Sequence, residues 1–186
     1  MAGAAIVPAA GKGERFGGAK LLARIEDDVL LDRTLRSLLD AGITELIVVT
    51  APGADFGLVT RLADPRVRVM ENPDPSRGMF SSILQGLGAA SVDPILVLPA
   101  DMPFVRNSTV SSVIAACERT QKIVLPTHAG KHGHPVGLPA SIRAALLTAA
   151  PDSTLKAELA RTGVEQIEIT VDDPGVLRDV DVVSDL

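Results

Sequence analysis

The sequence contains very few aromatic residues and a single cysteine. It has no Trp or Tyr, and its aromatic share is 2%. Single-stranded nucleic acids are usually held by bases stacked on aromatic rings, so a surface of that kind is not expected. Cys117 has no second cysteine with which to form an internal disulfide, which fits a reducing compartment. Because it lies in an apolar helical stretch, we expect a buried thiol.

Excess positive charge and long apolar runs are also lacking. The net charge is -5 and the pI is about 5.2, so the phosphates of DNA, RNA or anionic lipid would repel the protein. No apolar run approaches the roughly 20 residues of a membrane span. The first residues lack the basic segment of a signal peptide, and Pro8 interrupts their apolar run. We therefore expect a cytoplasmic protein with no nucleic-acid or membrane partner.

The chain does have enough hydrophobic residues, 46% of 186, to fill one sizeable core, which predicts a single domain over residues 1–186. Apolar segments of strand length alternate with amphipathic segments, which predicts an α/β fold with a parallel sheet. Strands are expected at residues 4–7, 45–50, 67–70, 94–98, 122–125 and 164–171. Helices are expected at residues 32–41, 80–90, after Asn107, at 140–149 and at 154–161, with Asp32 available as an N-cap and Gly42 beyond the first helix end. The polar turn at 127–135 predicts a β-hairpin appended to the parallel sheet.

A glycine-rich segment, residues 8–20, directly follows the first predicted strand. Its glycines allow the backbone to bring N–H groups close to phosphate oxygens, and Arg15 and Lys20 supply positive charge. The dinucleotide-binding fingerprint does not fit, because three residues separate Gly13 from Gly17. A P-loop does not fit either, because leucine follows Lys20. The alternative is a glycine-rich turn with two solvated cations. It does not explain why Arg15 and Lys20 are placed around the glycines.

Two further segments carry candidate site residues. Asp101 follows the buried strand at 94–98, where the carboxyl ends of parallel strands face a ligand crevice, so it could hold a hard cation against a triphosphate or merely cap the turn before Pro103. The loop that begins at Asn72 leads into a helix through Gly78, Ser81 and Ser82. These residues could bind a base or sugar edge, and they could equally be the N-capped start of a helix.

Together these segments resemble the MobA-like nucleotidyltransferase family, especially its molybdenum-cofactor cytidylyltransferase branch. The resemblance rests on Ala9-Ala-Gly-x-Gly-x-Arg-Phe-Gly-x-x-Lys20, Gly78-Met-x-x-Ser-Ile83, Asp101-Met-Pro103, Gly133-His-Pro-Val136 and Asp179-Val-Asp181. It implies a Rossmann-like nucleotidyltransferase fold, a mostly parallel sheet with helices on both faces. It also implies nucleotide binding by Ala9, Ala10, Gly11 and Gly13, with Arg15 and Lys20 on the phosphates. Mg²⁺ would lie between Asp101 and Asp181, with Asp179 the competing ligand, and His134 would form a wall on the acceptor side.

The reaction implied is attack by an acceptor phosphate on the α-phosphate of a nucleoside triphosphate, with release of pyrophosphate. Arg15, Lys20 and Asp101 are the candidate catalytic residues. CTP is favoured over GTP as donor and molybdopterin is the suggested acceptor, with a protein partner to receive the product. The family's late Gly-Asp-x-Gly-Ala-Arg element is replaced by Pro151-Asp-Ser-Thr-Leu-Lys156, so a phosphosugar or another acceptor stays open.

Three other functions fit the sequence less well. A non-catalytic nucleotide sensor would have no need of Arg15, Lys20, Asp101 and Asp181 together. A nicotinamide-dependent oxidoreductase lacks the required glycine spacing. The cluster of His128, His132 and His134 suggests zinc, but exposed histidines on a turn need no ligand to be stable.

Overall fold

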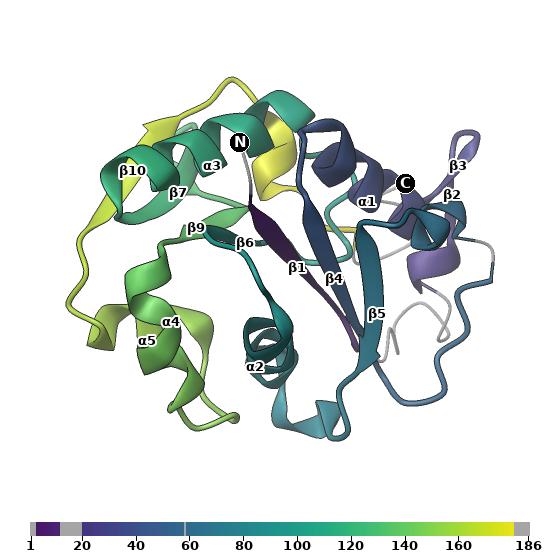
Figure 1. Ribbon diagram of the computed structural model, residues 1–186. Coiled ribbons are helices and arrows are strands. Elements are labelled where there is room, and N and C mark those ends of the chain that lie inside the picture. Colours follow the sequence, from purple (N-terminus) through teal and green to yellow (C-terminus); the bar gives the residue numbers. More distant parts are fainter. Residues whose placement is uncertain (1–2, 12–19, 58, 181–186) are drawn as a thin grey trace.

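The computed structural model describes residues 3–11, 20–57 and 59–180, and its centre is an eight-stranded sheet. The strand order is β10-β7-β9-β6-β1-β4-β5, and β8 pairs with β7 alone (Figure 1). The strands are β1 (Ala4–Ala9), β4 (Glu45–Thr50), β5 (Val67–Glu71), β6 (Ile95–Val97), β7 (Ile123–His128), β8 (Lys131–His132), β9 (Val136–Leu138) and β10 (Gln166–Thr170). The strands expected from the apolar segments are all found, with ends that differ by a few residues.

Most neighbouring strands run parallel, as the alternating sequence pattern predicted. β1 pairs in parallel with β4 on one side and with β6 on the other, and β4 pairs in parallel with β5. The chain therefore runs outward from β1 through β4 to β5 and then returns to β6 on the opposite side of β1. In sheets of this type, ligands bind outside the carboxyl ends of the strands where the order reverses. The topology places that position at the end of β1.

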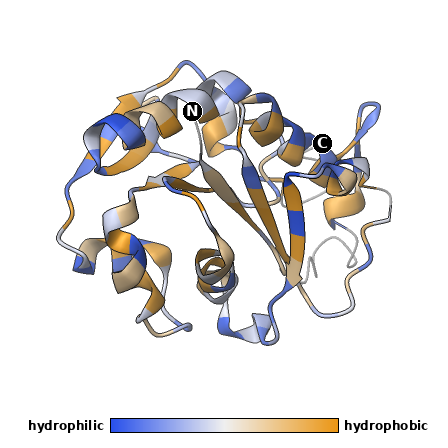
Figure 2. Ribbon diagram, in the orientation of Figure 1, coloured by the Kyte–Doolittle hydropathy of each residue, from blue (hydrophilic) through white to orange (hydrophobic). Residues whose placement is uncertain are grey.

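Helices cover both faces of the sheet. The helices are α1 (Leu30–Asp40), α2 (Met79–Ala89), α3 (Asn107–Thr120), α4 (Ala140–Leu147) and α5 (Leu155–Arg161). Alternate residues of β1 point to opposite faces: Ala5 and Val7 pack with side chains of α1 and α3, whereas Ala4 and Ile6 pack with side chains of α2 and α4. Hydrophobic and hydrophilic residues are interspersed along α1 and α3, as expected for helices that bury one side (Figure 2). The predicted arrangement is confirmed.

The polar turn after β7 forms a hairpin, but the sheet continues beyond it in an unexpected way. β8 pairs antiparallel with β7, and Ala129 and Gly130 at the turn have positive φ values of 49° and 74°. The next strand, β9, lies inside the sheet, antiparallel to both β6 and β7. The expectation of a hairpin appended to the parallel sheet was therefore wrong for its second extended piece. The strand pairs along both of its edges, and its apolar side chains Val136 and Leu138 are buried in the core on one face of the sheet.

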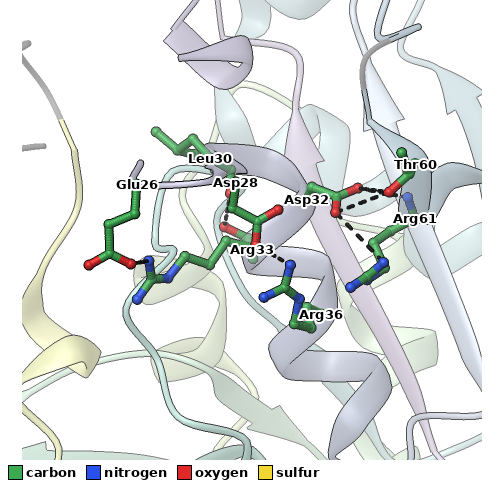
Figure 3. A network of polar contacts seen from close by, with 9 residues as sticks. Glu26, Asp28, Leu30, Asp32, Arg33, Arg36, Thr60 and Arg61 are labelled. Atoms are coloured by element: carbon green, nitrogen blue, oxygen red, sulfur yellow. Dashed lines mark hydrogen bonds and ion pairs between the residues drawn. The ribbon is translucent and has the colours of Figure 1, made fainter. Parts of the chain in front are cut away.

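The expected role of Asp32 as the cap of α1 was also wrong. A small antiparallel hairpin, β2 (Arg24–Ile25) with β3 (Asp28–Val29), leads directly into α1, and the N–H of Leu30 donates to the carbonyl of Ala23 at 2.9 Å. The helix therefore begins two residues earlier than expected. Asp32 is buried in its first turn and accepts hydrogen bonds from the backbone N–H of Arg61 (2.7 Å) and the hydroxyl of Thr60 (3.1 Å), as Figure 3 shows. It ties α1 to η3 (Thr60–Ala63).

The end of α1 matches the sequence prediction more closely. The helix ends at Asp40, and Gly42 follows with φ of +88°, a conformation that other residues rarely adopt. None of the helices in the described part of the chain combines the length and the apolar character needed to cross a membrane.

Candidate functional site

A cavity of about 680 Å³ lies at the carboxyl ends of β1, β4 and β6, where the strand order reverses. Three segments at these strand ends line it: residues 8–11 at the end of β1, Ala51 and residues 54–56 after β4, and residues 99–101 after β6. The η2 turn (Lys20–Leu22) and the first turn of α2 complete the wall. Of the residues expected around a nucleotide, Ala9, Ala10 and Gly11 line this cavity. Gly13 and Arg15 lie outside the described residues.

Lys20 and Asp101 meet in the wall of the cavity. The ammonium nitrogen of Lys20 lies 2.8 Å from Oδ2 of Asp101, and the two side chains are 13% and 26% exposed. Asp101 follows β6 and Lys20 stands at the start of η2, so the neighbouring positions of β1 and β6 in the sheet bring their segments together. A partly buried cation beside a carboxylate, both lining one cavity, provides opposite charges for a phosphorylated ligand and its counter-ion.

The end of the described chain also reaches Asp101. The backbone N–H of Val180 donates to the backbone carbonyl of Asp101 at 2.9 Å. Val180 is fully buried against Ile25 and Leu30. The competing metal ligand Asp179 is therefore adjacent in the chain to a residue bonded to Asp101, whereas Asp181 lies outside the described residues.

Some polar residues of the loop before α2 and of its first turn line the cavity, and others lie behind the cavity wall. Gly78 and Ser82 line the cavity. Asn72 is buried, and its side-chain amide donates to the hydroxyl oxygens of Ser81 (2.7 Å) and Ser82 (3.0 Å). Asn72 and Ser81 do not line the cavity. Their hydrogen bonds instead orient Ser82 and the start of α2.

Sequence reasoning missed the wall formed after β4. Ala51, Ala54 and Phe56 line the cavity but belong to a segment with no recognisable motif. The buried carboxylate of Asp32 holds the end of this segment at Thr60 and Arg61. The position directly after a central parallel strand was the only signal that could have identified it.

His134 is half-buried and is not among the residues that line the cavity. Its backbone N–H donates to the carbonyl of Val176 at 2.9 Å. Burial lowers the pKa of His134 below its ordinary value, and the negative charges of Asp101 and Asp179 oppose this shift. The imidazole is therefore held toward its neutral form, close enough to Asp101 to feel its charge.

The other two histidines of the turn point to separate partners. His128 Nδ1 lies 3.1 Å from the carbonyl of Val171, and His132 Nε2 lies 2.6 Å from Oε1 of Glu168. Across residues 3–11, 20–57 and 59–180, no three His, Cys, Asp or Glu side chains are grouped in a way that could hold a metal ion.

The donor set does suit a magnesium ion completed by substrate. Mg²⁺ is usually bound through one or two carboxylates and the oxygens of substrate phosphates, so it requires no cage of protein ligands. Asp101 provides one such carboxylate in the cavity wall. Lys20 Nζ lies 2.8 Å from Oδ2 of Asp101 and would neutralise part of the negative charge of the same phosphates.

The fold and the cavity define an α/β domain of the kind that binds nucleotides at a switch point of its sheet. Residues 5–167 match the model of the MobA-like NTP transferase domain, so the chain belongs to this family, whose members are nucleotidyltransferases. The family resemblance inferred from the sequence motifs is thereby confirmed.

Individual relatives agree with this assignment. The chain is 26% identical over 132 residues to the molybdenum cofactor cytidylyltransferase of Escherichia coli, which covers 70% of this chain and 67% of the relative. It is 34% identical over 133 residues to the 2-C-methyl-D-erythritol 4-phosphate cytidylyltransferase of Saccharopolyspora erythraea, covering 68% and 59%. Several curated relatives are matched over only about half of their length, 51% and 49% in two cases.

Solved structures show the same fold. A nucleotidyl transferase from Methanothermobacter thermautotrophicus superposes with a TM-score of 0.79 and 25% identity, covering 100% of this chain and 94% of that one. The Rv0371c protein of Mycobacterium tuberculosis, solved in complex with manganese, gives a TM-score of 0.78 at 24% identity and covers 99% and 94%. The expected Rossmann-like nucleotidyltransferase fold, with its mostly parallel sheet, is confirmed.

Proposed function

We propose that this protein, acting as a single domain over residues 1–186, transfers a cytidylyl group from CTP to a phosphorylated small acceptor, with Mg²⁺ and with release of pyrophosphate. The observation that carries the proposal is the pair formed by Lys20 and Asp101, 2.8 Å apart in the wall of a cavity at the carboxyl ends of β1 and β6. Phosphoryl-type transfer requires positioning and charge neutralisation more than covalent chemistry by the protein. A cation, a carboxylate and a glycine-rich backbone supply those functions.

The triphosphate would lie along the segment after β1. Among the residues that the structure describes, no atom lies within 4 Å of the position that a β-carbon would take at Gly11, which supports a close approach of its backbone to phosphate oxygens. Lys20 would stabilise charge that grows on the α-phosphoryl oxygens as the new bond forms. Arg15 is proposed to hold the leaving pyrophosphate, and Gly13 to add a backbone N–H donor.

The nucleoside would lie between the end of β1 and the start of α2. Ala9 and Ala10 offer backbone groups, and Ser82 offers a hydroxyl held in place by Asn72. Ser81 donates to the carbonyl of Gly78 at 2.7 Å, which fixes the helix start that forms this wall. The small side chains of Ala9, Ala10 and Ser82 leave room for the base.

Asp101 and a late aspartate, Asp181 or its competitor Asp179, would hold the metal ion against the triphosphate. When bound, Mg²⁺ neutralises phosphate charge and fixes the orientation of the chain of phosphates. The hydrogen bond from Val180 to the carbonyl of Asp101 supports a late ligand, because it brings the neighbouring Asp179 close to the Asp101 loop. A manganese complex of a protein with the same fold supports a divalent metal.

The acceptor would approach from the side of His134. The acceptor phosphate is ionised at pH 7, so the reaction needs no general base. The neutral imidazole of His134 can orient the acceptor without repelling Lys20. The relatives named above act on molybdenum cofactor and on 2-C-methyl-D-erythritol 4-phosphate, according to their names. Molybdopterin is our first choice of acceptor, because the motif resemblance favours that branch, and methylerythritol phosphate is the second.

The test is pyrophosphate release measured with CTP, GTP, ATP and UTP, each with Mg²⁺ and with each of the two acceptors. We expect release with CTP and one acceptor, and none when Mg²⁺ is replaced by a chelator. Asp101→Asn keeps the shape of the side chain and removes its charge, and should abolish the metal-dependent rate. Release with GTP alone would overturn the choice of donor. An unchanged rate for Asp101→Asn would overturn the role of the carboxylate.

A further inference from the structure

The segment after β10 forms a strap, residues 172–180, that lies along the loop carrying Asp101. This C-terminal strap contains η5 (Pro174–Leu177). It contacts the loop of residues 101–107 at three places: near Asp101, at Phe104 and at the start of α3. The loop is therefore bracketed by one continuous piece of chain.

Asp173 makes the contact at the start of α3. Its side chain is 2% exposed. Oδ2 accepts hydrogen bonds from the backbone N–H of Arg106 (2.9 Å) and the hydroxyl of Thr109 (2.7 Å), and Oδ1 accepts one from the N–H of Gly175 (3.0 Å). One buried carboxylate therefore joins the strap to the far end of the Asp101 loop.

The same carboxylate serves two helix starts at once. α3 has no side-chain cap of its own, and Asp173 supplies an acceptor and a negative charge at that N-terminus from 64 residues away. Asp173 is also the N-cap of η5 and accepts from Gly175 within it. An amide in its place would keep one acceptor oxygen and leave the donors at one of the two helix starts unpaired, whereas a shorter apolar side chain would leave both unpaired, which is costly in the protein interior.

The other contacts show how closely the strap fits the loop. A β-carbon added at Gly175 would clash with the carbonyl oxygen of Phe104, so any larger residue would push the strap away. The guanidinium of Arg178 lies 3.9 Å from the centroid of the Phe104 ring. Val180 then bonds to the carbonyl of Asp101 itself at 2.9 Å.

We propose that Asp173 is a positioning residue of the transferase, which uses the C-terminal strap to fix the Asp101 loop in the geometry that binds a metal–nucleotide complex. The inference rests on the proposed function, because it assigns a task to Asp101. Asp173 does not line the cavity; it acts through Arg106 and Thr109 at one end of the loop and through the strap at the other. Residues that orient metal ligands typically alter metal affinity or activity about 10- to 100-fold when mutated.

The primary experiment measures Mn²⁺ binding to the protein of residues 1–186 in the presence of CTP, by the loss of the free Mn²⁺ signal in electron paramagnetic resonance beyond the loss that CTP alone causes. Asp173→Asn keeps the size of the side chain and removes its charge. We expect its affinity for Mn²⁺ with CTP to fall about tenfold or more. Gly175→Ala, which leaves Asp173 intact and displaces the strap, should lower the same affinity.

A matched control separates positioning from stability. Glu158 is a buried carboxylate on α5 that accepts from Ser153 and Arg161, away from the cavity. Glu158→Gln should lower the melting temperature as a buried carboxylate substitution does, with Mn²⁺ affinity unchanged. If Asp173→Asn proves too unstable, Thr109→Val removes a single hydrogen bond to the same carboxylate and provides a milder test.

Hydrogen exchange tests the geometry directly. The amide of Val180 should exchange at least about tenfold faster in Asp173→Asn than in Glu158→Gln, because the strap is released from the loop. Unchanged Mn²⁺ affinity and unchanged Val180 exchange in folded Asp173→Asn would overturn the inference and leave Asp173 a purely structural residue. If the unmodified protein binds no Mn²⁺ with CTP or GTP, the proposed function itself fails, which is a distinct result.

Discussion

The side chains of Lys20 and Asp101 form an ion pair of 2.8 Å across 81 residues of sequence. Their segments follow two neighbouring parallel strands, so the sheet brings a cation and a carboxylate to one edge of a cavity. Each side chain is mostly buried, which strengthens their interaction relative to an exposed pair. The pair is the part of the site on which the first two predictions depend.

Removing the Lys20 ammonium should impair turnover far more than stability. Lys20→Ala is expected to lower kcat roughly 10²- to 10³-fold, the usual cost of losing one contact to charge that develops in a transition state. Pyrophosphate release measures the rate, and circular dichroism measures the melting temperature. Lys122→Ala is the control, because it removes a surface ion pair with Glu165 that lies far from the cavity. A Lys20 variant that keeps full activity would exclude this role.

Removing the Asp101 charge should uncouple metal from nucleotide. The unmodified protein is expected to melt at a higher temperature with CTP and Mg²⁺ than with CTP alone, because a ligand that binds only the folded state stabilises it. Asp101→Asn should lose the Mg²⁺-dependent part of this shift. The measurement is a thermal shift series over nucleotides with Mg²⁺ or with chelator. An equal Mg²⁺ effect in both proteins would assign the metal to other ligands.

The tie made by Asp32 should matter for both stability and nucleotide affinity. Asp32→Ala removes a buried carboxylate that accepts hydrogen bonds from the hydroxyl of Thr60 and the backbone N–H of Arg61, at an expected cost of about 1–3 kcal/mol in the free energy of unfolding. The KM for nucleotide should rise, because the segment held by this tie forms the cavity wall after β4. Urea unfolding and steady-state kinetics measure the two effects.

An exposed ion pair in the same region serves as the control for Asp32. Glu26 pairs with Arg33 at 2.9 Å and is 78% exposed (Figure 3). Glu26→Gln should change the free energy of unfolding by less than about 1 kcal/mol, because exposed pairs are screened by solvent. Equal losses in Glu26→Gln and Asp32→Ala would contradict the special role given to the buried carboxylate.

Cys117 should make the protein sensitive to alkaline pH. Burial raises the pKa of its thiol to about 12 from 9.0, with the charge of Asp93 adding to the shift. In the unfolded chain the thiol therefore loses its proton above pH 9, whereas in the folded protein it keeps it until about pH 12. The contribution of the Cys117 thiol to the free energy of unfolding is therefore fully present below pH 9. It falls by about 1.4 kcal/mol for each pH unit above that value.

The variant Cys117→Ala isolates that contribution. The free energy of unfolding of the unmodified protein, minus that of the variant, should decrease between pH 8 and pH 10.5. Absence of tyrosine from the sequence removes one other group that titrates in this range. A difference that stays constant with pH would show that Cys117 ionises as readily in the folded protein as in the unfolded chain.

Much of the fold followed from local patterns. Apolar segments of strand length located β1, β4, β5, β6 and β7, and Gly42 marked the end of α1. These features are local because hydrophobic periodicity and glycine conformation depend on a few neighbouring residues. The glycine-rich segment, Asp101-Met-Pro103 and the Gly-His-Pro element also indicated the family through residue types and spacing alone, and the family match confirmed it.

The errors lay where pairing between distant segments governed the outcome. β9 is three residues long and gained its interior position from β6 and β7, which flank it on both sides. Asp32 has the chemistry of a helix cap, yet its carboxylate bonds to η3 because the β2–β3 hairpin already starts the helix earlier. Neither outcome is visible in a local window of sequence.

Residue types and their spacing were enough to identify the family, because the glycine-rich segment, a cation and a carboxylate stand in the order that the family's motifs have. How those groups meet depended on tertiary packing: Lys20 pairs with Asp101, Asn72 stands behind Ser82, and Asp173 joins the strap to α3. Each of these contacts spans separate parts of the chain or depends on which face of an element is buried. Such contacts are set by the packing of the whole sheet, which no short stretch of sequence encodes.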